Sequence, residues 1–167
     1  MTAVPRRAME AIDAWAGEPA GDWPGEFFRF LSRYLPVINV DLLILDEQGR
    51  VLLVWRDDEL YGAGWHVPGG IIRYRETAAA QIRETAKREL GTEVEFEPAP
   101  AVIEEMVEHE RRERGHLISM VYRCRLLGPP DPALEWREGQ PRRDQWAWHE
   151  GWPADLIAAQ GWYRKRF

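Results

Sequence analysis

The sequence predicts an α+β protein, an α/β/α sandwich in which a mixed β-sheet lies between helices. Two aliphatic, β-branched segments joined by a short turn occupy residues 36–58. A strongly helical segment follows at 76–90, and strand-like segments lie on both sides of it. Strands before and after a central helix, with another helix near the C-terminus, indicate a layered domain.

The boundaries of the elements follow from composition and from residues that break regular structure. "DEQGR" at 46–50 is the expected turn between the first two strands, and "GWHVPGG" at 64–70 is a loop with a short strand. The segment 76–90 is rich in Ala, Glu, Lys and Arg, and Gly91 ends it. We expect strands within 92–110 and 116–127, a turn-rich loop at 128–144, a last strand at 145–150 and a short helix in the tail.

The first 35 residues are expected to form an N-terminal extension, residues 1–35, attached to a domain at 36–167. A breaker-rich stretch at 17–25 separates a loosely tied lead-in from "EFFRFLSRYL" at 26–35. The apolar residues of the second segment recur at helical spacing. This helix is expected to cap the core or to pack on a partner, and it is a candidate contact in a homodimer.

Composition narrows the class of protein. The chain has 167 residues, enough for one domain with its own core, and a net charge of −6. That charge argues against a general nucleic-acid-binding protein, which needs a basic surface. A single cysteine, Cys124, excludes an intramolecular disulfide framework and a multi-cysteine zinc site. Apolar runs are too short to span a bilayer and the start lacks the apolar stretch of a signal peptide, so we expect a cytoplasmic protein with no membrane partner.

One spacing carries the functional prediction. Gly70 is followed after five residues by Glu76, and the helix ends in "RELG" at Gly91. This frame resembles the Nudix box, in which three helical carboxylates on one face hold Mg²⁺ against a diphosphate. The resemblance therefore implies the Nudix fold and a Nudix hydrolase.

The box of this chain is reduced. The three carboxylate positions of the family fall on Thr85, Arg88 and Glu89, so only one carboxylate remains. A similarly reduced box occurs in the GDP-mannose mannosyl hydrolase branch of the superfamily, and residues 36–92 resemble that branch without gaps. The resemblance predicts one metal ion instead of several.

The resemblance also implies a reaction and its residues. In that branch water attacks the anomeric carbon of the sugar, and the nucleoside diphosphate leaves on one Mg²⁺, with Mn²⁺ as an alternative ion. The match assigns the metal to Glu89 and the backbone carbonyl of Gly69, the diphosphate contact to Arg56, and assistance at the sugar to Asp41. The residues that match the Nudix box are Gly70, Glu76, Glu89 and Gly91.

This sequence departs from the family pattern at the positions that contact the substrate and at the position of the general base. A substrate arginine of the helix falls on Glu84, and another falls on Ile71, although Arg73 lies two residues further on. The loop that supplies a histidine base contains none here: one alignment places Arg142 and Arg143 there, another Gln140 and Pro141. Arg143 is a candidate diphosphate contact. His116, which could converge with His109, is the candidate catalytic base, and the other open candidates are Glu104, Glu105 and Asp144.

Three functions remain open. The first is a Mg²⁺-dependent hydrolase of a nucleoside diphosphate linked to a sugar. The second is a conventional Nudix pyrophosphohydrolase that attacks phosphorus, against which the reduced box argues, because such chemistry uses more metal ions. The third is a catalytically weak Nudix-fold module that only binds its ligand.

Overall fold

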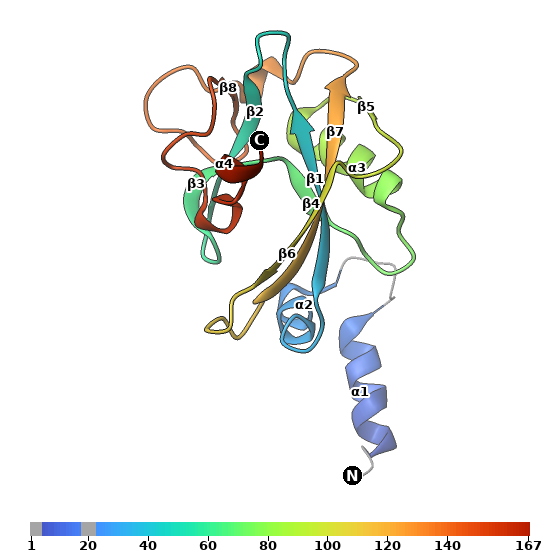
Figure 1. Cartoon of the computed structure of the whole chain (residues 1–167). Helices are drawn as coiled ribbons and strands as arrows, with labels where there is room; N and C mark the ends of the chain where they lie inside the picture. Colours follow the sequence, from blue (N-terminus) through green and yellow to red (C-terminus); the bar gives the residue numbers. More distant parts are fainter. Residues whose placement is uncertain (1–4, 18–22) are drawn as a thin grey trace.

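The computed structural model describes residues 5–17 and 23–167, and the segment 18–22 and residues 1–4, parts of the predicted lead-in, lie outside the described residues. Figure 1 shows the order of the elements along the chain. They are α1 (Arg6–Ala16), α2 (Gly25–Leu31), β1 (Val37–Ile44), β2 (Val51–Asp58), β3 (Gly62–His66), β4 (Gly69–Ile71), α3 (Ala78–Leu90), β5 (Val94–Phe96), β6 (Val102–Val107), β7 (His116–Leu126), η1 (Pro132–Leu134), β8 (Trp146–His149), η2 (Ala158–Gln160) and α4 (Tyr163–Arg166).

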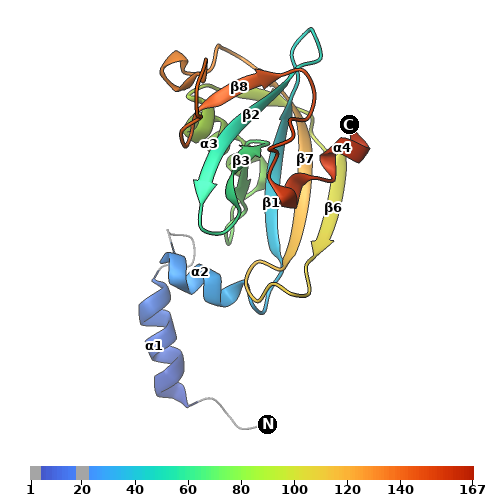
Figure 2. The same ribbon diagram turned by 90° about the vertical axis from the view of Figure 1, so that its left-hand side faces the viewer.

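The strands form two sheets, where we predicted one. The larger sheet has the order β4-β1-β7-β5, with β6 also paired to β7, and the smaller has the order β3-β2-β8. β1 and β7 run parallel while the other pairs are antiparallel, so the larger sheet is mixed as predicted. The sheets separate after the 46–50 turn because both edges of β1 are taken, by β4 and β7, which leaves β2 to pair elsewhere (Figure 2).

Two clusters of buried side chains hold these layers together. One lies under α3, where Ile82, Ala86 and Leu90 pack on side chains of β1 and β2. The other faces the C-terminal tail and joins Trp55 and Trp65 of the smaller sheet to side chains such as Tyr163. With α3 on one side and the tail helices on the other, the predicted α+β sandwich is confirmed.

Helix α3 ends at Leu90, as predicted, and begins at Ala78, two residues later than predicted. The Thr77 hydroxyl accepts a hydrogen bond from the Ala80 amide (3.1 Å), which caps the first turn. Gly91 ends the helix with φ 66°, a left-handed conformation that suits glycine. The box residues of this helix are therefore in the register that the spacing predicted.

The described part of the N-terminal segment holds two helices, of which the second was predicted. None of the residues of α1 is buried, and it meets α2 through the ring of Trp15, 5.2 Å from that of Phe27. Helix α2 ends at Leu31, earlier than predicted, and Ser32 just after it accepts a hydrogen bond from the Arg114 amide (3.1 Å). The extension thus packs on the domain through α2, while the domain boundary at residue 36 and the homodimer stay predictions.

Within the described ranges, no helix combines the length and the apolar character needed to cross a bilayer.

We predict that Gly70→Ala destabilises the fold by about 1–3 kcal/mol, the usual cost of overpacking. A Cβ at this position would lie 1.9 Å from the Gln81 side chain and 2.6 Å from the Thr85 hydroxyl. Urea denaturation measures the change. Gly25→Ala is the matched control, since a Cβ there meets nothing within 4 Å. Equal stability of the two variants would contradict the tight contact of β4 with α3.

Candidate functional site

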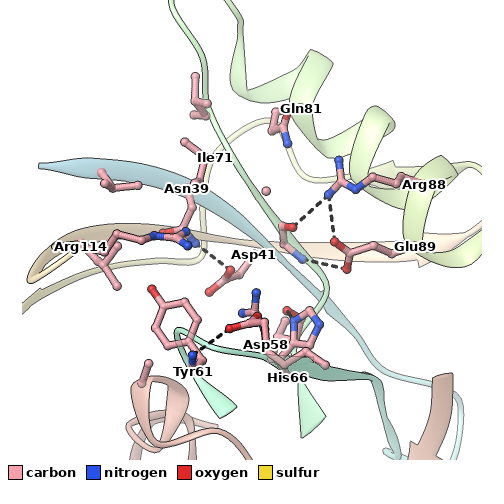
Figure 3. A pocket seen from close by; sticks show the side chains of 18 of the residues that line it. Asn39, Asp41, Asp58, Tyr61, His66, Ile71, Gln81, Arg88, Glu89 and Arg114 are labelled. Carbon is pink, nitrogen blue, oxygen red and sulfur yellow. Dashed lines mark hydrogen bonds and ion pairs between the residues drawn. The ribbon is translucent and has the colours of Figure 1, made fainter. Parts of the chain in front are cut away.

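An open cavity of about 1260 Å³ lies where β1, β2, β4 and α3 meet. Helix α2 contributes Phe28 to one end, and the loop before β8 contributes Arg143 and Asp144. Several polar side chains line it from different elements, as Figure 3 shows in part: Asn39, Asp41, Asp58, His66, Arg88, Glu89 and Arg114. The cavity is the candidate active site.

Asp41 is a buried carboxylate within this site, with 3% of its surface exposed. Its Oδ2 accepts hydrogen bonds from the hydroxyls of Ser119 (2.5 Å) and Tyr163 (2.9 Å), and Oδ1 accepts one from the Asn39 amide (2.8 Å). Burial raises the pKa of Asp41 to about 6, and the three hydrogen bonds act in the opposite direction. Asp41 is therefore a fixed carboxylate whose charge is balanced by donors from β1, β7 and α4.

Glu89 meets strand β4 across the cavity, as the Nudix frame predicted. Its Oε2 accepts a hydrogen bond from the Gly69 amide (3.3 Å). Burial raises the pKa of Glu89 to about 7, while the guanidinium of Arg88 acts in the opposite direction. The structure thus places Glu89 beside the Gly69 backbone, and the assignment of a metal to these two groups stays a prediction.

Arg88 lies between the two groups that we predicted as metal ligands. Its Nη2 donates to Glu89 Oε1 (2.9 Å) and to the carbonyl oxygen of Gly69 (3.2 Å). Figure 3 shows the side chain reaching from α3 to both partners. One nitrogen of a permanent cation therefore contacts both of the oxygens expected around a metal ion.

The donor set does not fit the predicted Mg²⁺ site. Mg²⁺ requires oxygen ligands in a near-octahedral arrangement. Of the three positions that carry carboxylates in the family, Thr85 is fully buried in the helix face, Arg88 is a cation, and Glu89 is already paired with it. Among residues 5–17 and 23–167, no group of three or more His, Cys, Asp or Glu side chains is arranged to hold a metal ion.

Glu76 stabilises the loop between β4 and α3 through hydrogen bonds. Its Oε2 accepts a hydrogen bond from the Arg73 amide (2.9 Å). With the amide nitrogen of Gln81 turned toward this carboxylate, Gln81 donates to both oxygens, at 2.9 and 3.0 Å. These contacts hold the loop against the helix, which is a structural role for this residue of the box.

Arg56 stands at the end of β2 in a cluster of cations around Tyr61. Its Nε donates to Asp58 Oδ2 (2.8 Å), and its guanidinium lies 4.8 Å from the centre of the Tyr61 ring. The guanidinium groups of Arg111 and Arg114 lie 5.0 and 5.3 Å from the same ring. Three arginines with one nearby aspartate form a positive wall, suited to anions, of which Arg56 and Arg114 line the cavity.

The other predicted residues divide between the cavity and the outer face. Arg73 and Arg143 line the cavity with Asp144. His116 does not: it stands at the start of β7, where its Nε2 lies 2.9 Å from Glu105 on β6. Glu104 pairs with Arg166 (3.4 Å), and His109 is exposed in the turn after β6. His116, His109, Glu104 and Glu105, which the sequence offered as candidate bases, are thus absent from the cavity lining.

His66 is a site residue that the sequence analysis missed. It is buried, lines the cavity, and its Nδ1 lies 2.9 Å from the carbonyl oxygen of Val67. In the tautomer that donates this hydrogen bond, Nε2 is an acceptor. Burial lowers the pKa of His66 to about 3, and the charge of Arg56 acts in the same direction, so the ring is neutral. His66 lies in the glycine-containing stretch 64–70, where the spacing of apolar residues does not indicate which side chains are buried.

We predict that His66 makes the protein less stable as the pH falls. The pKa of His66 is about 3 in the folded protein and near 6.5 in the unfolded chain, so below pH 6.5 the unfolded chain binds a proton that the native protein does not. Compared with His66→Gln, the wild type should lose about 2 kcal/mol between pH 7 and pH 5. Subtracting the variant removes the opposite contributions of Asp41 and Glu89, whose pKa values are raised. The free energies of unfolding come from urea denaturation at each pH. If the wild type and His66→Gln lost the same free energy of unfolding between pH 7 and pH 5, a buried neutral imidazole would be contradicted.

Part of this chain is similar in sequence to a curated protein. The chain is 34% identical over 82 residues to the low-salt glycan biosynthesis protein Agl8 of Haloferax volcanii, a match that covers 49% of this chain and 52% of the relative. The chain thus spans about half the length of the curated relative it matches.

Solved structures share the fold. A MutT Nudix hydrolase from Burkholderia pseudomallei superposes with a TM-score of 0.58 at 22% identity, covering 75% of this chain and 92% of the other. An asymmetric diadenosine tetraphosphate hydrolase candidate from Jonesia denitrificans gives 0.51 at 20% identity, covering 69% and 77%. The NUDIX domain pattern matches residues 35–159, most of the chain. This protein belongs to the Nudix family.

Proposed function

We propose that the protein is a Nudix hydrolase that acts on a nucleoside diphosphate linked to a sugar, with water attacking the anomeric carbon. The observation that carries this proposal is the charge of the helix face. Thr85, Arg88 and Glu89 together have no formal net charge, and Arg88 is paired with Glu89 (2.9 Å). Attack at phosphorus in this fold relies on carboxylates that gather several metal ions, and such a face is missing from the described α3.

Attack at the sugar carbon makes smaller demands on the site. The phosphorus centres stay intact, so the protein must stabilise the negative charge of the departing nucleoside diphosphate. Arg56 and Arg88 line the same cavity and both interact electrostatically with Glu89 and His66. Their charges suit a diphosphate that lies between β2 and α3. Arg73 and Arg143 line the same cavity and are further candidate contacts.

Asp41 is the group that we assign to the attacking water. It is a carboxylate in the cavity, opposite Gly69 in the β1–β4 register, and its three hydrogen-bond donors fix its position. A general base must lie within reach of the water, and geometry precedes pKa in choosing it. His116, on the outer face beside Glu105, is not part of this assignment.

The proposed step is a substitution at carbon. The oxygen of water forms a bond to the anomeric carbon as the bond between that carbon and the diphosphate oxygen breaks. The electron pair leaves with the nucleoside diphosphate beside the arginines, and the proton of the water passes to Asp41. The products are the free sugar and the nucleoside diphosphate. A relative that is named for low-salt glycan biosynthesis supports a sugar-linked substrate.

Hydrolysis in ¹⁸O-labelled water tests the bond that breaks. A panel of nucleoside diphosphate sugars, including GDP-mannose, is incubated with the protein, and mass spectrometry locates the label. We expect ¹⁸O in the sugar and none in the phosphates. Label in a phosphate would mean attack at phosphorus and a conventional pyrophosphohydrolase. Ligand binding without turnover would mean a binding module.

Asp41→Asn should lower kcat by about 10²–10⁴-fold, the usual contribution of a general base, and leave the affinity for product nucleotide unchanged. The amide is nearly isosteric but cannot accept the proton of the water. Asp46→Asn is the control, because Asp46 lies in the β1–β2 turn, bonded to Arg50 (2.7 Å). Thermal melting separates a loss of folding from a loss of catalysis. Full kcat in a folded Asp41→Asn variant would rule out Asp41 as the base.

A further inference from the structure

Arg88 is held in a defined position by both edges of the site. It comes from α3, and one of its nitrogens, Nη2, donates to Glu89 on the same helix and to the Gly69 carbonyl on β4. The Gly69 amide in turn donates to Glu89 Oε2 (3.3 Å). The three groups form a closed set of contacts, so the guanidinium is fixed even though 46% of the side chain is exposed.

The remaining donors of Arg88 are suited to a phosphate. A guanidinium has five N–H donors in a rigid plane, and Nη2 carries two of them. Nε and Nη1 carry the other three, and because these point to different sides of the guanidinium, each can donate separately to an oxygen of the diphosphate. Because the side chain lines the cavity and is partly exposed, these donors are accessible to a ligand.

A divalent cation would compete with Arg88 for the same oxygens. The family resemblance assigned the metal to the Gly69 carbonyl and to Glu89, and the guanidinium donates hydrogen bonds to that carbonyl and to Glu89 Oε1. A cation bound there would lose these ligands to Arg88 or would lie next to its positive charge. The replacement of a family carboxylate by Arg88 thus removes a ligand and adds a competitor.

We propose that Arg88 performs the metal's charge-balancing role, so that this protein binds a nucleoside diphosphate without a divalent cation. Its guanidinium neutralises Glu89 and presents donors to the diphosphate, with Arg56 of β2 lining the same cavity. This inference rests on the proposed function only for the choice of a diphosphate as the ligand. Glu89 then positions Arg88.

Calorimetric titration with GDP, ADP and UDP tests the binding directly. In the wild type, the affinity for the nucleotide that binds best should be the same within about twofold in excess EDTA and in excess MgCl₂. Arg88→Ala should weaken it by about 10- to 100-fold in EDTA, the range for a lost charge-assisted hydrogen bond. Arg83→Ala is the control, because Arg83 lies on the same helix and donates to the Ala79 carbonyl, outside the cavity lining. Binding that disappears in EDTA, an unaffected Arg88→Ala variant, or no binding of any of the three nucleotides overturns the proposal.

Arg88→Glu provides the reverse test. It restores a second carboxylate beside Glu89 and removes the competing cation. Mn²⁺ binding, measured by electron paramagnetic resonance without nucleotide, should be at least about 10-fold tighter in Arg88→Glu than in the wild type, consistent with a gain of more than 1.4 kcal/mol. Equal Mn²⁺ affinity in the two proteins would contradict the proposal. Thermal melting confirms that the variant is folded.

These measurements do not depend on turnover. A wild type that binds a nucleotide equally in EDTA and MgCl₂, but hydrolyses no nucleoside diphosphate sugar, would support the role of Arg88 and contradict the proposed hydrolysis. Hydrolysis at the sugar carbon by a protein that binds only with Mg²⁺ would support the hydrolysis and contradict the role of Arg88.

Discussion

The contact of Gly70 with helix α3 is the constraint on which the rest of the site depends. A side chain at this position would collide with Gln81 and Thr85, so glycine lets β4 lie directly on the helix. The neighbouring Gly69 then has its amide and its carbonyl within hydrogen-bonding distance of Glu89 and Arg88. On its other side β4 pairs with β1, which brings Asp41 opposite Gly69. One close approach of backbone to helix thus brings Asp41 and Glu89 to the same cavity.

The charges of Asp41 and Glu89 are balanced in different ways. Asp41 is surrounded by neutral donors from Asn39, Ser119 and Tyr163, whereas Glu89 is paired with the cation of Arg88. Burying a carboxylate without such partners would be costly. The neutral donors leave Asp41 as a carboxylate in the cavity, while Arg88 brings positive charge to the diphosphate end. The site therefore combines a carboxylate and cations within one cavity, as the proposed separation of a sugar from a charged leaving group requires.

The sequence predicted the fold and the frame of the site, because both depend on local patterns. Periodicity defined the strands and α3, and the spacing of Gly70, Glu76 and Gly91 gave the register that brings Glu89 to Gly69. The second sheet was not predicted, since the pairing of β1 with both β4 and β7 is a long-range property. Tyr163 was missed for the same reason, since it reaches Asp41 from the C-terminal helix α4. Arg88 was recognised as a departure from the family, but its contact with the Gly69 carbonyl required the structure.

The central claim is that a fixed arginine takes the place of a metal ion beside Glu89. A crystal structure of the protein with a nucleoside diphosphate and MnCl₂, measured with anomalous scattering from manganese, tests it most directly. We predict diphosphate oxygens on the Nε and Nη1 donors of Arg88, with no anomalous peak between Glu89 and the Gly69 carbonyl. A manganese peak that coordinates those two oxygens, with Arg88 turned away, would contradict it.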